Sequence, residues 1–165
     1  MSMDAAHTQR WQIAEVVFGV PILVAIALQL ATPLSLGHGF LAPVATLGGA
    51  ALIVAGVAFV LLGRRELGQQ AQPTDPGLPT TRLVTTGVFS VSRNPLYLGA
   101  ACLLAGIALA ADLPWVLVVL VPALAACHFV LVAPEERYLA ARFGEEYREY
   151  AASVHRWIGR ARRSR

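Results

Sequence analysis

Residues 96–133 read LYLGAACLLAGIALAADLPWVLVVLVPALAACHFVLVA, two apolar runs separated by a single charged residue. That residue, Asp112, is followed two positions later by Pro114. Proline favours the first position of a helix, where its missing N–H has no intrahelical partner to lose. The pattern predicts a tight antiparallel helical hairpin with spans at 96–111 and 113–133.

Two further apolar runs, at 11–31 and 40–62, precede this hairpin. The 165 residues are 56% hydrophobic and 14% charged, which is too apolar for a soluble domain of this size. A 21-residue helix is about 31 Å long, enough to cross a ~30 Å hydrocarbon core. We expect one all-α integral membrane domain over residues 1–165, with four transmembrane helices, a cytoplasmic loop at 64–94 and a cytoplasmic tail at 134–165.

Two prolines and a glycine mark changes of direction in the C-terminal part. Pro122 is expected to kink the fourth span, and Pro134 to end it before a new amphipathic helix. Gly144 is expected to stop or bend that helix. Residues 145–154 then predict an interfacial amphipathic helix, with aromatic and apolar side chains spaced three and four residues apart.

The basic residues set the expected orientation. All 13 are arginines, found at Arg10, between Arg64 and Arg93, and from Arg137 onward. The positive-inside rule therefore predicts that both termini and the central loop are cytoplasmic. The absence of lysine beside many arginines and alanines favours a GC-rich bacterial genome and hence a bacterial inner membrane.

The net charge of +3 and the arginine-rich tail predict contact with anionic lipid headgroups rather than with nucleic acid. Trp157 lies within this tail. Cys102 and Cys127 lack metal-ligand spacing, so we expect packing roles for them and no metal site. The oligomeric state stays open, although the glycines of the second span, Gly48, Gly49 and Gly56, permit close helix contact within or between chains.

The candidate chemical groups lie at the cytoplasmic ends of the hairpin. Arg93 directly precedes the expected helix cap Asn94 and the first-turn residue Pro95. An antiparallel hairpin brings this segment near Glu135 and Glu136. Two interpretations stay open: a site for a zwitterionic ligand with an amino acid moiety, or an interfacial salt bridge whose glutamates also complement a helix dipole.

His128 lies about five residues inside the expected cytoplasmic end of the fourth span. An ionisable group at that depth is a functional candidate. Its possible roles are general base, substrate orientation, or a simple hydrogen bond to a neighbouring helix.

Two motifs in the C-terminal half carry a family resemblance. The first has the form L-x-x-x-G-x-[YF]-x-x-x-R-[HN]-P-x-Y-x-G and occupies Leu83, Gly87, Phe89, Arg93, Asn94, Pro95, Tyr97 and Gly99. The second has the form E-E-x-x-L-x-x-x-F-G-x-x-Y-x-x-Y and occupies Glu135, Glu136, Leu139, Phe143, Gly144, Tyr147 and Tyr150. With both motifs, the chain resembles the isoprenylcysteine carboxyl methyltransferase and phospholipid methyltransferase superfamily of integral membrane enzymes.

This resemblance implies a methyltransferase that uses S-adenosylmethionine and acts on a lipophilic acceptor entering from the bilayer. The acceptor group can be a prenylcysteine-type carboxylate, an amine headgroup or a thiol. Asn94 stands where the eukaryotic prenylcysteine enzymes have histidine, so it cannot serve as an acid or base. The implied catalytic residues are Arg93, Glu136 and His128, and the implied cofactor-binding residues are Arg93, Asn94, Tyr97, Gly99, Glu135, Glu136 and Tyr147.

Two other functions remain as alternatives. One is an NADPH-dependent reductase similar to the membrane sterol reductases, which share a similar arginine, proline and tyrosine motif. The short chain and the lack of an obvious arginine cluster in the 64–94 loop argue against it. The other is a non-catalytic membrane binding protein.

Overall fold

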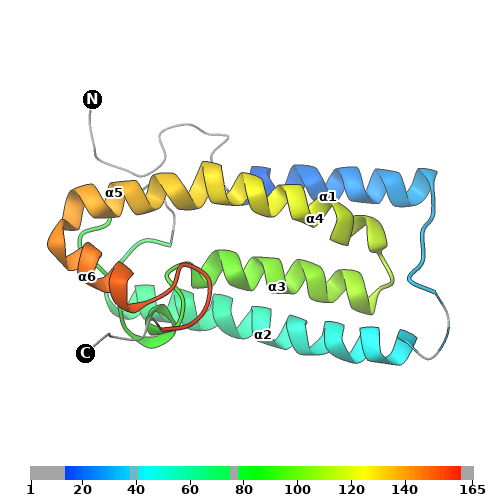
Figure 1. The fold of residues 1–165 in the computed structure, drawn as a ribbon, viewed down its shortest axis with the longest axis horizontal. Helices are drawn as coiled ribbons and strands as arrows, with labels where there is room; N and C mark the ends of the chain where they lie inside the picture. Colours follow the sequence, from blue (N-terminus) through cyan, green and yellow to red (C-terminus); the bar gives the residue numbers. More distant parts are fainter. Residues whose placement is uncertain (1–13, 38, 40, 75–77, 161–165) are drawn as a thin grey trace.

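The computed structural model describes residues 14–37, 39, 41–74 and 78–160 (Figure 1). The described residues form helices and no β-strand, which confirms the all-α prediction. The elements are α1 (Ala14–Ala31), α2 (Leu41–Gln69), the 3₁₀ turn η1 (Gly87–Ser90), α3 (Pro95–Ala110), α4 (Pro114–Ala126), the π-helical η2 (Cys127–Val132), α5 (Ala133–Phe143) and α6 (Glu145–Ser153).

The long helices lie side by side as a bundle. α2 packs chiefly against α3, and α4 packs against both α1 and α3 (Figure 1). The α1–α2 and α3–α4 connections lie at one end of the bundle, whereas the long α2–α3 loop, α6 and the end of the described chain lie at the other (Figure 1). The described arginines all belong to segments at this second end, so we call it the arginine-rich end. Which side of a membrane it faces stays a prediction.

Two helical stretches are long and apolar enough to cross a membrane, Ala42–Gln69 and Pro114–Phe143. The apolar parts of α1 and α3, Val16–Ala31 and Pro95–Ala110, are shorter. Large apolar side chains on the outer faces of the bundle are exposed, among them Leu23, Leu30, Leu47, Val54, Val121 and Phe129. Such exposure is typical of a surface that faces lipid rather than water. The apolar helices thus suggest a membrane protein, and the crossing of all four stays a prediction.

Glycines let α2 and α3 come into backbone contact. A Cβ added at Gly49 would lie 2.6 Å from the carbonyl oxygen of Gly106, and one at Gly56 would lie 2.7 Å from that of Gly99. Neither distance leaves room for a methyl group. The close contact expected at Gly49 and Gly56 is therefore confirmed within one chain, whereas Gly48 has nothing within 4 Å of its added Cβ.

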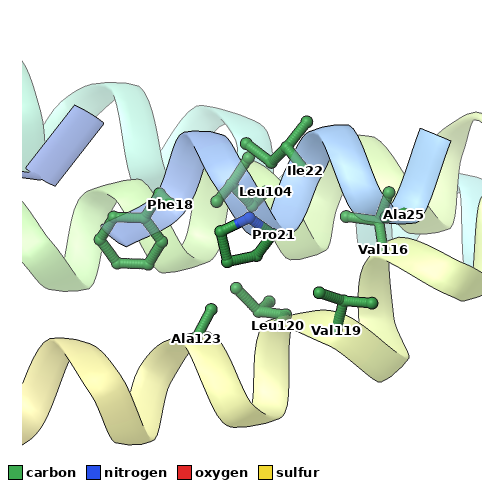
Figure 2. Close-up of a pocket in the computed structure, with 9 residues that line it drawn as sticks. All are labelled: Phe18, Pro21, Ile22, Ala25, Leu104, Val116, Val119, Leu120 and Ala123. Atoms are coloured by element: carbon green, nitrogen blue, oxygen red, sulfur yellow. The ribbon is translucent and has the colours of Figure 1, made fainter. Parts of the chain in front are cut away.

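The contact among α1, α3 and α4 is apolar. Figure 2 shows Phe18 and Pro21 of α1 facing Leu120 of α4 across a cavity of about 10 Å³ with apolar walls. This space is large enough for about one water molecule and its walls offer no polar partner. We interpret it as a packing gap in the bundle core rather than a ligand site.

The prediction that Pro134 ends the fourth span is wrong. α4, η2 and α5 follow one another without a break, and Pro134 lies in the first turn of α5. The physical reason lies in the preceding π-helical turns, where the N–H of Ala133 bonds to the carbonyl of His128, five residues back. This wider spacing moves the carbonyls that a proline ring would otherwise crowd. The departure from α-helical geometry begins five residues after Pro122.

Gly144 ends α5 as predicted, with φ of 55°. α6 then packs its aromatic face inward, because Tyr147, Tyr150 and Val154 form a buried cluster with Leu83 of the α2–α3 loop. This face was expected to lie at the membrane interface. The sequence pattern identified the apolar face correctly, but the partner of that face is the protein itself.

At the opposite end of the bundle, Asp112 joins the two short connections. Its carboxylate accepts hydrogen bonds from the hydroxyl of Ser35 at 2.5 Å and from the N–H of Leu36 at 2.6 Å. Nearby, the indole of Trp115 donates to the carbonyl of Thr32 at 2.8 Å. These bonds hold the α1–α2 connection against the α3–α4 hairpin.

Candidate active site

The segment before α3 is held by the C-terminal part of the chain. Pro95 begins the helix, and the carbonyl of Asn94 accepts the first helical bond from Leu98 at 3.0 Å. The sequence predicted that the Asn94 side chain caps the helix, but this side chain makes no capping hydrogen bond. Its Nδ2 donates instead to the carbonyl of Arg156 at 3.1 Å. Asn94 is buried, so its amide orients the chain around Arg93.

A charged cluster lies behind this segment and consists of Arg93, Glu136, Arg156 and Tyr147. Nη1 of Arg93 lies 3.2 Å from Oε1 of Glu136 and donates to the Tyr147 hydroxyl at 3.1 Å. Arg156 binds both oxygens of the same carboxylate, with Nη2 at 2.6 Å and Nε at 3.0 Å. The salt bridge that the sequence left open as an alternative is therefore present.

The charged cluster carries one more positive charge than negative. The pKa of Tyr147 is raised to about 12, chiefly by burial and also by Glu136, while Arg93 acts to lower it, so its hydroxyl is neutral near pH 7. The hydrogen bond to Glu136 raises the pKa of Arg156. Nε of Arg93 is buried and has no hydrogen-bond partner among the described residues. A buried, charged N–H without a partner is costly, which makes this atom a candidate ligand contact.

A second link joins α3 to α5. The hydroxyl of Tyr97 donates to Oε2 of Glu135 at 3.2 Å. The two sequence motifs therefore meet in space, as the antiparallel hairpin predicted.

A cavity of about 640 Å³ opens beside these groups. Its volume lies in the range of small-molecule sites. Four of the predicted site residues line it: Arg93, Asn94, Tyr97 and Glu135. The walls combine such polar groups with apolar side chains from α2, α3 and α5, including Val60, Leu96, Ala100 and Leu139.

The cavity also contains groups that sequence reasoning missed. Arg64 of α2 and Arg82 of the loop line it together with Arg93, so three arginines from separate segments line one cavity where no arginine cluster was expected. Gln72 positions Arg82: its Oε1 accepts from the N–H groups of Thr81 and Arg82 at 2.9 and 3.1 Å. The available signal was the position of Arg64, the first charge after a long apolar run.

Other predicted residues lie away from the cavity lining. Glu136 and Tyr147 contact Arg93 but do not line the cavity themselves. Gly99 lies in the α2–α3 contact, where an added Cβ would meet Val60 at 2.8 Å. His128 lies in η2 with its ring packed edge to face on Phe129. The roles expected for these residues in cofactor binding and catalysis stay predictions.

Two arginines and the tryptophan of the arginine-rich stretch at residues 156–165 contact the rest of the protein, and the expected contact of this stretch with lipid headgroups stays a prediction. Arg156 pairs with Glu136, and Arg160 donates to the carbonyl of Ser90 at 3.2 Å. Trp157 packs against the buried cluster that includes Leu131 and Val132. The last three arginines of the sequence, Arg162, Arg163 and Arg165, lie outside the described residues, as does Arg10.

Comparison with known proteins adds an independent observation. The family model for phospholipid methyltransferase matches residues 44–146, more than half of the chain. The match contains the first motif, the second motif from Glu135 to Gly144, and the cavity residues from Val60 to Leu139. Comparison with curated proteins and with solved structures gives no match. The chain belongs to the phospholipid methyltransferase family, whose members are membrane methyltransferases.

Proposed function

We propose that the protein transfers a methyl group from S-adenosylmethionine to a lipophilic acceptor in the 640 Å³ cavity. The observation that carries this proposal is the presence of both Arg93 and Glu135 in the walls of one cavity. The buried, unpartnered Nε of Arg93 suits a carboxylate, and Glu135 suits an ammonium group or ribose hydroxyls. These are the charged and polar groups of S-adenosylmethionine, so the residues present fit that cofactor.

The cofactor, when bound, supplies an electrophilic methyl group on a sulfonium sulfur. The protein contributes positioning: Arg93 and Glu135 hold the two charges of the amino acid moiety, and Tyr97 orients Glu135. An amine or thiol acceptor also has to lose a proton, and Glu135 is the one carboxylate among the described residues that line the cavity. A carboxylate acceptor needs no such step.

Apolar residues support the choice of a lipophilic acceptor. Val60 on α2 and Leu96 and Ala100 on α3 line the same cavity as the charged groups. α2 and α3 are apolar helices, so an acceptor with an apolar chain can reach the cavity along their surface. We further propose that the arginine-rich end faces the cytoplasm of a bacterial inner membrane, where S-adenosylmethionine is available, because the described arginines gather there.

The test is calorimetry of the detergent-purified protein with S-adenosylmethionine, S-adenosylhomocysteine and NADPH. We expect binding of the two methyl cofactors and none of NADPH. Arg93→Ala should weaken binding about tenfold or more, because it removes the buried N–H group proposed to bind the carboxylate of the cofactor. Arg148→Ala is the matched control, since Arg148 is 70% exposed and pairs with Glu145 on the surface of α6.

Absence of binding by either methyl cofactor would contradict the proposal, and binding of NADPH would favour the reductase. Incubation with methyl-labelled cofactor and a lipid extract then identifies the acceptor class. Binding without methyl transfer to any lipid fraction would favour a non-catalytic binding protein.

A further inference from the structure

The described C-terminal segment, residues 154–160, folds back onto the start of α3. Val154 and Arg160 form an antiparallel bridge, and the N–H of His155 bonds to the carbonyl of Gly159 at 2.9 Å. The segment then docks through two further backbone bonds, from Gly159 N–H to Val91 at 2.8 Å and from Arg93 N–H to His155 at 3.2 Å. Backbone bonds thus hold this closed loop directly against the residue that carries the candidate ligand contact.

Arg156 lies in this loop and contacts both halves of the site. Its carbonyl accepts from Nδ2 of Asn94 at 3.1 Å and from the hydroxyl of Ser92 at 3.4 Å. Its guanidinium binds both oxygens of Glu136 on α5. Ser92 and Asn94 are buried, so these contacts fix the two sequence motifs relative to each other.

The paired bonds to Glu136 also affect Arg93. A carboxylate held by Arg156 at both oxygens shares only Oε1 with Nη1 of Arg93. Arg93 therefore does not form a bidentate ion pair with Glu136. This arrangement leaves its buried Nε without a partner among the described residues while Arg93 still borders the cavity.

We propose that Arg156 is a positioning residue for cofactor binding, acting through Glu136 on Arg93. This inference rests on the proposed function and extends the site beyond residues 44–146, where the family match ends. Arg156 occupies both oxygens of the Glu136 carboxylate, so that only Oε1 is shared with Arg93 and the buried Nε of Arg93 stays available for the carboxylate of the ligand.

The test measures the dissociation constant for S-adenosylmethionine and the kcat and KM for its turnover on a lipid extract. Arg156→Ala should raise the dissociation constant about tenfold, because Glu136 then pairs fully with Arg93. KM for the cofactor should rise more than kcat falls. Arg160→Ala is the control from the same loop, since the Arg160 side chain donates to the backbone carbonyl of Ser90 and not to Glu136, and its binding should match the unmodified protein.

Rescue separates positioning from a general loss of structure. The double variant Arg156→Ala with Glu136→Gln removes the carboxylate that would capture Arg93, and should recover much of the affinity. If Arg156→Ala does not fold, Arg156→Lys retains the charge without the paired geometry, and should bind the cofactor several-fold more weakly than the unmodified protein.

The outcomes are distinct. If the unmodified protein does not bind the cofactor, both the proposed function and this inference fail. If it binds and Arg156→Ala binds equally well, or the double variant is no better than the single one, the positioning role alone fails. If Arg156→Ala does not fold and Arg156→Lys binds the cofactor as well as the unmodified protein does, the positioning role also fails.

Discussion

The hydroxyl of Tyr97 lies 3.2 Å from Oε2 of Glu135 and joins α3 to α5 at the cavity wall. Tyr97→Phe removes this donor and keeps the ring. We expect weaker binding of S-adenosylmethionine by about three- to tenfold, in line with the loss of about 1 kcal/mol from one hydrogen bond. Calorimetry measures the change, and an unchanged dissociation constant would show that Tyr97 does not orient Glu135 for the ligand.

The neighbouring glycines Gly48 and Gly49 provide a matched pair. Gly49→Ala places a methyl group 2.6 Å from the carbonyl oxygen of Gly106, so α2 and α3 must separate, at a cost of about 1–3 kcal/mol. Gly48→Ala meets nothing within 4 Å, and should be neutral or stabilising by up to about 1 kcal/mol through helix propensity. Thermal unfolding in detergent compares the two, and equal midpoints would contradict the close α2–α3 contact.

Asp112 combines two hydrogen bonds with a left-handed backbone, at φ of 54°. Asp112→Ala loses both bonds and also disfavours this conformation, so we expect a loss of about 2–4 kcal/mol. Asp112→Asn tolerates the conformation and keeps one acceptor, so its loss should be smaller. Thermal unfolding midpoints give the order, and an Asn variant no more stable than the Ala variant would argue against the backbone contribution.

The raised pKa of Tyr147 predicts a loss of stability at alkaline pH. Its pKa rises from an ordinary value near 10 to about 12 in the fold, because burial disfavours the charged form. The stability that this shift contributes is fully present below pH 10 and falls as the pH rises toward 12. The free energy of unfolding should therefore fall less steeply with pH above pH 10 in Tyr147→Phe than in the unmodified protein. Identical profiles would place the Tyr147 hydroxyl in contact with water.

The hairpin and the meeting of the two motifs could be predicted because they depend on local patterns. Apolar runs of known length locate the helices, and the short turn at Asp112 makes α3 and α4 antiparallel. That geometry alone brings Tyr97 near Glu135. The glycine contacts followed likewise from residue size at Gly49 and Gly56.

The contacts of Arg156 and the place of Arg64 in the cavity wall could not be predicted in the same way. An arginine near a membrane helix is usually explained by orientation, and its partner becomes visible only once the chain turns back at Gly144. Pro134 was misinterpreted for a related reason. A proline ends an α-helix under ordinary spacing, and the π-helical turns that accommodate it leave no clear mark in the sequence.

The π-helical turns of η2 have a further consequence, which concerns rotational phase. Each residue of an α-helix turns the chain by about 100°, and a π-turn in effect inserts one extra residue. Deleting one residue within Cys127–Val132 would restore regular α-helical spacing and rotate Glu135 and Glu136 by about 100° relative to α4. The apolar packing of α4 would be kept while both carboxylates turned away from Tyr97 and Arg93. The π-helical turns of η2 therefore set how far α5, which carries the two carboxylates, is rotated about the helix axis relative to α4, which packs in the bundle.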